Sequence, residues 1–99
     1  MPKGYVIFTE QVHDAEAMGS YSQGAIPSLL EAGGRIAVAD TDASVLEGEG
    51  HGSQTVVLEF DTVEAARGWY ESEGYQALIP QRQAAADSNV VLLTGFEMP

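Results

Sequence analysis

The pattern of apolar and polar positions predicts four β-strands. Residues 5–10 are β-branched or aromatic on both alternating faces, as expected for a strand covered on both sides. Residues 35–40 alternate as a second strand, and residues 44–47 allow a short continuation of it. Residues 54–60 give the clearest strand, and residues 89–94 give the last one.

A first helix is predicted between the first two strands. Asp14 is a plausible N-cap, and Gly33-Gly34 supplies the stop. Pro27 lies inside the helix and is expected to kink or break it, because proline lacks an amide hydrogen. The apolar face has spacings of three and four residues and consists of Met18, Tyr21, Ala25, Ile26, Leu29 and Leu30.

A second helix is predicted directly after the third strand. Asp61 and Glu64 have the spacing of a capping box. The helix is expected to break near residues 72–74 and to continue to about residue 87. The glycine-rich turn at residues 47–53, before the third strand, is a candidate lid for a pocket.

The order β-α-β-β-α-β predicts an α+β, ferredoxin-like fold, in which both helices cover one face of a four-stranded antiparallel sheet. The uncovered face then exposes apolar side chains. The expected set, or its neighbours in the other register, is Tyr5, Ile7, Val57, Val90 and Leu92. Such a patch is typical of an interface, so we expect a homodimer with the two sheets face to face.

Composition narrows the function classes. The 99 residues are expected to form a single domain, 1–99, with a net charge of −11, which disfavours nucleic acids and anionic membranes as partners. No cysteine is present, which excludes disulfides and thiolate metal sites. With no signal peptide or apolar span in the sequence, a cytoplasmic location is expected. We expect no cofactor and no metal.

Several motifs are spread along the chain: Gly4-Tyr-Val-Ile, Gly33-Gly34-Arg35, Leu46-Glu47-Gly48, Leu58-Glu59-Phe60, Glu64-Ala-Ala-Arg-Gly-Trp-Tyr-Glu-Ser72, Gly74-Tyr75-Gln76 and Arg82. Together they resemble the domain of unknown function 1330 family, and the resemblance covers nearly the whole chain. The segment from Glu64 to Ser72 is the most specific of them. The chain departs from the family at Gly74, where many members have an acidic residue.

The resemblance implies the dimeric α/β barrel fold. Its superfamily includes cofactor-independent monooxygenases, muconolactone-type isomerases and members without demonstrated activity. In the enzymes the pocket lies between the sheet and the helices, which would make the second helix its wall.

Arg82 is the most informative single residue. Helical spacing places it on the same face as Tyr75, on an otherwise apolar stripe. A buried guanidinium needs a carboxylate or several carbonyls, so Arg82 either pairs with a residue such as Glu59 or anchors an anionic ligand. A buried hydroxyl of Tyr70 or Tyr75 could also find its partner in a ligand.

The remaining candidates come from the third strand, the glycine-rich turn and the second helix. Glu59 either pairs with an arginine such as Arg35 or acts as an acid or base with a raised pKa. Trp69 is expected mainly to pack. His51 is a possible general base, although no nucleophile accompanies it and an exposed turn residue is the simpler interpretation.

We therefore expect a pocket between the second helix and the sheet that binds a small anionic or aromatic molecule. The catalytic candidates are Tyr70, Tyr75 and His51, and the binding candidates are Arg82, Trp69, Glu59 and Arg35. Three hypotheses remain open: a cofactor-independent isomerase or oxygenase, a binding or stress-related module without turnover, and a purely structural role for these side chains.

Overall fold

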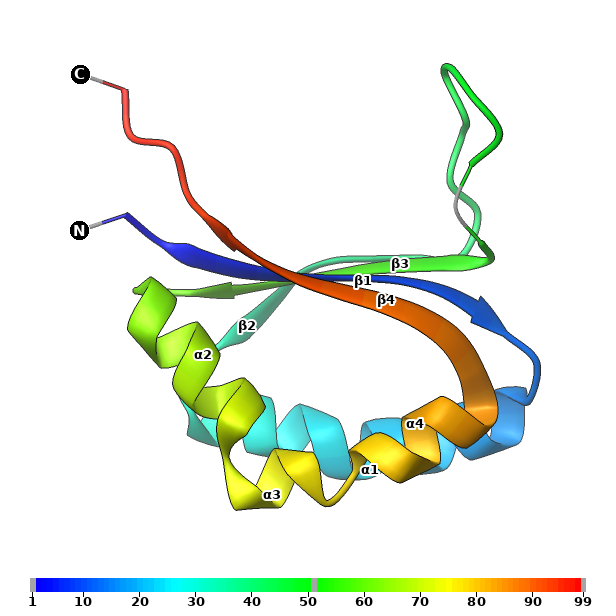
Figure 1. The fold of residues 1–99 in the computed structure, drawn as a ribbon, viewed down its shortest axis with the longest axis horizontal. Helices are drawn as coiled ribbons and strands as arrows, with labels where there is room; N and C mark the ends of the chain where they lie inside the picture. The colour runs from blue at the N-terminus through cyan, green and yellow to red at the C-terminus, as the bar shows by residue number, and fades with distance from the viewer. Residues whose placement is uncertain (1, 51, 99) are drawn as a thin grey trace.

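The computed structural model describes residues 2–50 and 52–98. The elements follow in the order β1 (Gly4–Val12), α1 (Ala15–Glu31), β2 (Arg35–Asp40), β3 (Gln54–Phe60), α2 (Val63–Glu71), α3 (Glu73–Gln76), α4 (Ile79–Ala85) and β4 (Ala86–Thr94). The strands form one antiparallel sheet in the order β2-β3-β1-β4. All helices of the described residues lie on one face of it (Figure 1), so the predicted α+β, ferredoxin-like fold is confirmed. None of these helices has the length and apolarity that crossing a bilayer requires.

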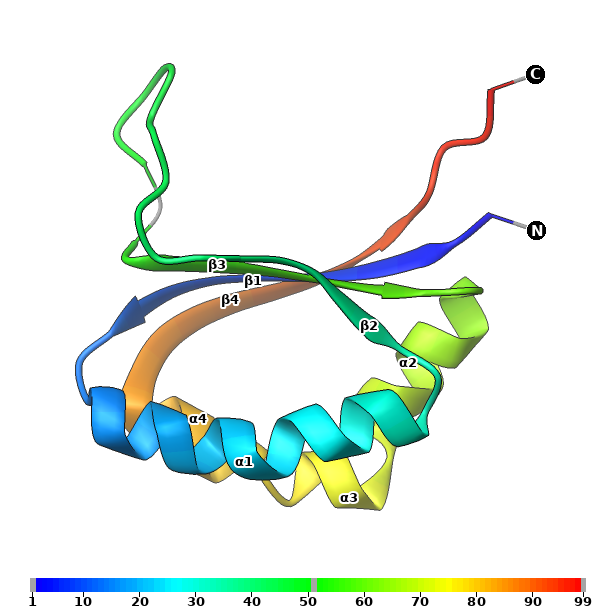
Figure 2. The ribbon, with the colours of Figure 1, turned by 180° about the vertical axis from the view of Figure 1, so that it is seen from behind.

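The first helix agrees with its sequence signals. The Asp14 carboxylate accepts a hydrogen bond from the Ala17 amide at 3.0 Å, as an N-cap should. Of the kink or break expected at Pro27, the break is wrong, because α1 continues through this residue. Pro27 has no amide hydrogen, so the Gln23 carbonyl four residues earlier has no donor within the helix. Both residues are exposed. Water can therefore replace the missing bond. Figure 2 shows α1 running along one face of the sheet.

The second helical region is divided more finely than predicted. Its cap is Thr62, whose hydroxyl accepts from the Ala65 amide at 3.0 Å, and not Asp61, whose carboxylate reaches Arg35. The expected break occurs at Ser72, which has extended backbone angles, and a second one follows at residues 77–78. Helix α4 ends at Ala85, and β4 begins earlier than expected.

Residues 44–47 do not extend the second strand. The Asp40 carboxylate accepts a hydrogen bond from the Asp42 amide at 2.7 Å, and this local turn ends β2. The following loop projects from the sheet on the side opposite the helices (Figure 1). Leu46, in this loop, is 92% exposed.

Strand register decides which side chains face the helices. Val6 and Phe8 are buried against them, whereas Tyr5 and Ile7 point to the open face. Of the two registers left open for the last strand, the one with Val90 and Leu92 on the open face is wrong, because Val90 pairs with Phe8 and Leu92 with Val6, and both contact the core. The exposed apolar residues of β4 are instead Val91 and Leu93.

Candidate functional site

A cavity of about 220 Å³ lies between α1 and the sheet. The sequence had placed the pocket under the second helix, but α2 contributes only Trp69 to this wall. The residues around the cavity are Phe8, Glu10, Met18, Tyr21, Ser22, Ala25, Ile26, Leu29, Ile36, Ala39, Thr41, Gln54, Val56, Leu58 and Trp69. The lining is mostly apolar, with Tyr21 and Glu10 among its few polar members.

A second cavity of about 190 Å³ lies between α2 and the sheet. Tyr70 lies there with Val6, Ala66, Arg67, Val90 and Leu92. Arg67 directs its charge to Glu71, 3.6 Å away, at the exposed surface of the helix. The second cavity therefore contains Tyr70 but none of the buried charges of the core.

Glu10 is the buried carboxylate of the larger cavity, with 3% of its surface exposed. Gln54 donates to one of its oxygens at 2.9 Å, and Ser88 donates to the other at 2.8 Å. The backbone is also fixed, because the Ser53 amide donates to the Glu10 carbonyl at 2.8 Å. Gly52 lies against that carbonyl with a φ of +107°, where a β-carbon would collide.

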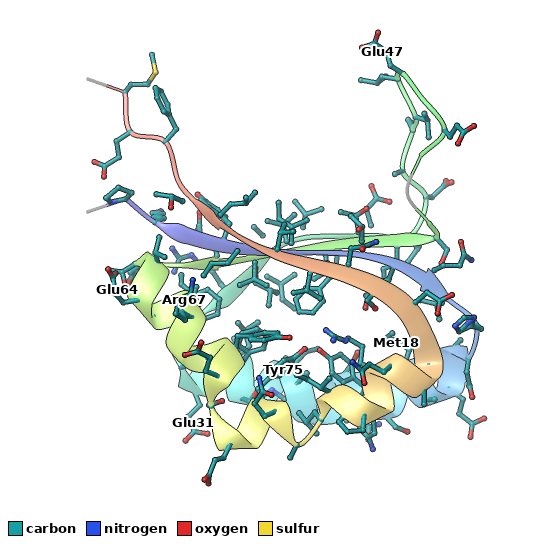
Figure 3. The ribbon with its side chains drawn as sticks, in the orientation of Figure 1. Met18, Glu31, Glu47, Glu64, Arg67 and Tyr75 are labelled. Atoms are coloured by element: carbon teal, nitrogen blue, oxygen red, sulfur yellow. The ribbon has the colours of Figure 1, made fainter. Side chains whose placement is uncertain are left out.

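Tyr21, Tyr75 and Arg82 form a chain of hydrogen bonds next to this carboxylate. The two phenol oxygens are 2.6 Å apart, and the Arg82 Nη1 donates to the Tyr75 oxygen at 3.3 Å. Tyr75 lies between the helix layer and the sheet and is completely buried (Figure 3). Burial raises the pKa of Tyr21 and of Tyr75, so both phenols are neutral at pH 7.

Arg82 is 4% exposed, as its position on the apolar stripe predicted. The expected carboxylate partner is not found: no carboxylate of the described residues lies within ion-pair distance. The guanidinium carbon lies 5.4 Å from the centre of the Phe8 ring, a cation–π contact. Its Nε has no hydrogen-bond partner among the described atoms. The charge of Arg82 is thus only partly satisfied by the protein.

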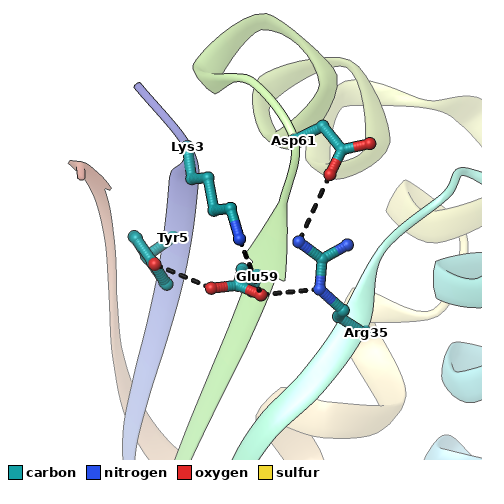
Figure 4. A network of polar contacts seen from close by, with 5 residues as sticks. All are labelled: Lys3, Tyr5, Arg35, Glu59 and Asp61. Carbon is teal, nitrogen blue, oxygen red and sulfur yellow. Dashed lines mark hydrogen bonds and ion pairs between the residues drawn. The ribbon is translucent and has the colours of Figure 1, made fainter. Parts of the chain in front are cut away.

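Glu59 and Arg35 lie on the open face and do not join this cluster. The Arg35 Nε lies 2.6 Å from a Glu59 oxygen, Tyr5 donates to the other oxygen at 2.7 Å, and Lys3 and Asp61 complete the network (Figure 4). The hydrogen bond from Tyr5, followed by that from Arg35, lowers the pKa of Glu59. A pairing of Glu59 with Arg82 and a raised pKa were therefore wrong alternatives, whereas the pairing with Arg35 is confirmed.

Trp69 packs in the core, as predicted, and also forms part of the cavity wall. Its ring centre lies 4.1 Å from that of Tyr75, and its Nε1 donates to the Ser28 hydroxyl at 3.1 Å. His51 lies outside the described residues. The loop around it is not placed as a lid, because Glu47 marks a part of the loop that extends away from the helices (Figure 3).

Glu10 and Tyr21 were not predicted to belong to the site. A signal was present for Glu10, because it continues the inward alternation of Val6 and Phe8 and so places a carboxylate on the buried face. Tyr21 was assigned to the apolar face of α1, but its contact with Tyr75 joins residues 54 positions apart. Within the described parts of the chain, no three His, Asp or Glu side chains gather as metal ligands would.

Comparison with known proteins identifies relatives of the fold. Residues 3–96 match the family described as "Domain of unknown function (DUF1330)". A protein of unknown function from Rhodopseudomonas palustris is 19% identical, with a TM-score of 0.80 over 98% of this chain and 85% of its own. No functionally curated protein matches the sequence.

Two further structures share the fold at low identity. SnoaB, a cofactor-independent oxygenase from Streptomyces nogalater, is 12% identical, with a TM-score of 0.71 over 99% of this chain and 97% of its own. A dimeric ferredoxin-like protein of unknown function from Thermobifida fusca is also 12% identical, with a TM-score of 0.63 over 94% and 91%.

Proposed function

Because the chain belongs to the domain of unknown function 1330 family and its core holds an apolar cavity with polar groups at its wall, we propose that it binds a small aromatic molecule between α1 and the sheet. The volume of about 220 Å³ limits the ligand. A dry cavity of about 150 Å³ holds benzene, so one or two rings with small substituents suit this site.

The hydroxyl of Tyr21 is the observation that carries the proposal. The Tyr75 oxygen accepts from Arg82, and its own hydrogen can be donated to the Tyr21 oxygen 2.6 Å away. The hydrogen of Tyr21 is then free for an acceptor in the cavity that Tyr21 lines. The chain Arg82, Tyr75, Tyr21 thus favours a ligand oxygen on which negative charge develops.

This geometry suits an isomerase or oxygenase that works without a cofactor, because such reactions pass through an anion of the organic substrate. The fold shared with a cofactor-independent oxygenase agrees with this class. The alternative is a binding or stress-related module that uses the same cavity without turnover. The two differ in turnover alone.

A thermal-shift experiment tests the binding site. Para-nitrophenol is expected to raise the melting temperature, because ligand at about 100 times its Kd adds roughly 2.7 kcal/mol to stability. Cyclohexanol, which is neither aromatic nor acidic, should have a smaller effect. Turnover is measured separately, as exchange of the α-hydrogens of indanone in heavy water that requires the wild-type protein. If the protein binds the aromatic probe but catalyses no exchange, the binding module without turnover is favoured.

Matched leucine variants on α1 locate the ligand. Ser22 lines the cavity and Ser20 is exposed on the same helix. Ser22→Leu is expected to remove the thermal shift because its side chain enters the cavity, whereas Ser20→Leu should retain it. A shift that persists in Ser22→Leu would place the ligand elsewhere, for example beside Tyr70. No shift with any aromatic probe would favour the purely structural role.

We also propose that the chain is a cytoplasmic homodimer whose open sheet faces pack together. Val38, Val91 and Leu93 are 43%, 48% and 46% exposed on this face, which is the kind of patch that another surface covers. A similar fold occurs in a dimeric protein.

Sedimentation is expected to show a dimer at micromolar concentration. Val91→Glu should shift it toward monomer, because a charge on the open face would be buried without a partner. Ser20→Glu carries the same charge change on α1 and should leave the dimer intact. A stable wild-type monomer at this concentration would rule the dimer out.

A further inference from the structure

We infer that Glu10 is the base of this site and that the cavity takes neutral, weakly acidic hydroxyl or keto compounds, whose proton Glu10 accepts. The inference rests on the proposed binding of an aromatic molecule beside Tyr21. It adds the chemical class of the substrate and a residue that was not among the sequence candidates.

The negative charge of Glu10 makes the cavity favour ligands that are neutral acids over ligands that are permanently anionic. Glu10 is the one charged side chain among the described residues that line it. A ligand that arrives as a carboxylate would meet a buried like charge, which is unfavourable in a medium of low dielectric constant. A neutral phenol or enol meets no such repulsion and brings a proton that a carboxylate can take.

Glu10 has the geometry that a base needs. A carboxylate has about four acceptor positions. Gln54 and Ser88 occupy one on each oxygen of Glu10. The remaining positions are available to a ligand, while the two donors and the bonded backbone hold the group in one orientation. A base held in this way needs no reorganisation before it accepts a proton.

Proton transfer would move the negative charge from Glu10 to the ligand oxygen beside Tyr21. The O–H bond of a phenol, or a C–H bond next to a carbonyl, breaks, and its proton bonds to a Glu10 oxygen. The electron pair remains on the ligand and its negative charge collects on an oxygen, to which Tyr21 donates. Arg82 supports that anion through Tyr75. Returning the proton to a different atom of the ligand completes an isomerisation in which all atoms and electrons balance.

The wild-type protein provides a test that needs no substitution. Para-nitrophenol is added at a pH below its own pKa, so that the free probe is neutral, and its ionisation is read from its absorption. Calorimetry in two buffers of different ionisation enthalpy measures the protons released. We expect the bound probe to absorb as phenolate with no net proton release, because the proton stays on Glu10. A neutral bound probe, or a phenolate whose proton appears in the buffer, would overturn the inference.

Glu10→Gln is the matching variant. It retains the size of the side chain and cannot accept the proton, so the bound probe is expected to absorb as neutral phenol. Catalysed α-hydrogen exchange of indanone, if the wild type shows it, should fall at least tenfold through kcat with KM little changed. Glu31→Gln, the same change on the exposed end of α1, should behave as wild type. Circular dichroism shows whether Glu10→Gln folds, and if it does not, the wild-type measurement decides alone.

The outcomes distinguish a failure of the proposed binding function from a failure of the proposed role of Glu10. If no aromatic probe binds to the wild-type protein, the proposed function itself fails. If the probe binds and the shift depends on Ser22, but Glu10→Gln still holds phenolate, only the role of Glu10 fails.

Discussion

Replacing Trp69 with alanine is expected to lower the free energy of unfolding by about 3–5 kcal/mol, the usual loss for a buried Trp or Phe. Trp69 is 3% exposed and lies between two layers. Its ring centre is 5.7 Å from that of Phe60 and 4.1 Å from that of Tyr75. The Nε1 bond to Ser28 also joins α2 to α1. For a domain of about this size, each kcal/mol lowers the melting temperature by about 4–8 °C.

Urea denaturation followed by circular dichroism measures this loss, since Trp69 is the only tryptophan and its fluorescence disappears with it. Trp69→Phe retains a ring in contact with Tyr75 and should lose less than half as much. Leu30→Ala truncates an apolar residue of α1 that is 60% exposed, so its effect should stay within about 0.5 kcal/mol. Equal losses for Trp69→Ala and Leu30→Ala would contradict the packing described for Trp69.

Replacing Tyr21 with phenylalanine is expected to weaken binding of the phenolate form of para-nitrophenol by about tenfold to a hundredfold. A hydrogen bond to a charged group contributes about 1.5–3 kcal/mol, which corresponds to this range. The ring remains in place, so the cavity keeps its apolar wall and neutral aromatic ligands should still bind. Titration of the probe, followed by absorption at several pH values, separates the affinities of the two forms.

Two further tyrosine variants serve as controls for this measurement. Tyr5→Phe removes a hydroxyl that donates to Glu59 on the open face, and it should leave the affinity unchanged. Tyr70→Phe tests the sequence candidate beside the smaller cavity. If Tyr70→Phe reduced phenolate binding and Tyr21→Phe did not, the site would lie between α2 and the sheet, and the proposal for the larger cavity would be wrong. The melting temperature of Tyr21→Phe must be recorded, because Tyr75 loses the partner that can accept its hydrogen.

The arrangement of strands and helices could be predicted from local sequence patterns. Alternation in β1 and β3 and the spacing of Met18, Tyr21 and Ala25 in α1 depend on the period of each element, which the chain carries by itself. The finer errors occurred where a distant group changed a local choice. Asp61 does not cap α2, because the helix begins at Val63 with Thr62 as its cap, and the Asp61 carboxylate instead lies 3.3 Å from Arg35. For β4, the pairing with β1 decides that Val91 and Leu93, the neighbours of Val90 and Leu92, lie on the open face.

The candidate site could be predicted only in part from the sequence. A buried Arg82 near Tyr75 followed from helical spacing, and the distances agree. The partner of Glu59 could not be decided from spacing, because the choice between Arg35 and Arg82 depends on the face of the sheet to which each side chain points. Glu10 and Tyr21 entered the site only when β1, β4 and α1 were brought together.

The sequence by itself therefore determined the four strands, the two helical regions, their order and the inward direction of Arg82, because hydrophobic periodicity acts within each element. Only the tertiary structure decided that the larger cavity lies under α1, that Glu59 and Arg35 belong to the open face, and that Glu10 meets Tyr21 at the cavity. These facts depend on strand register and on contacts between residues far apart in the chain, and no local pattern encodes them.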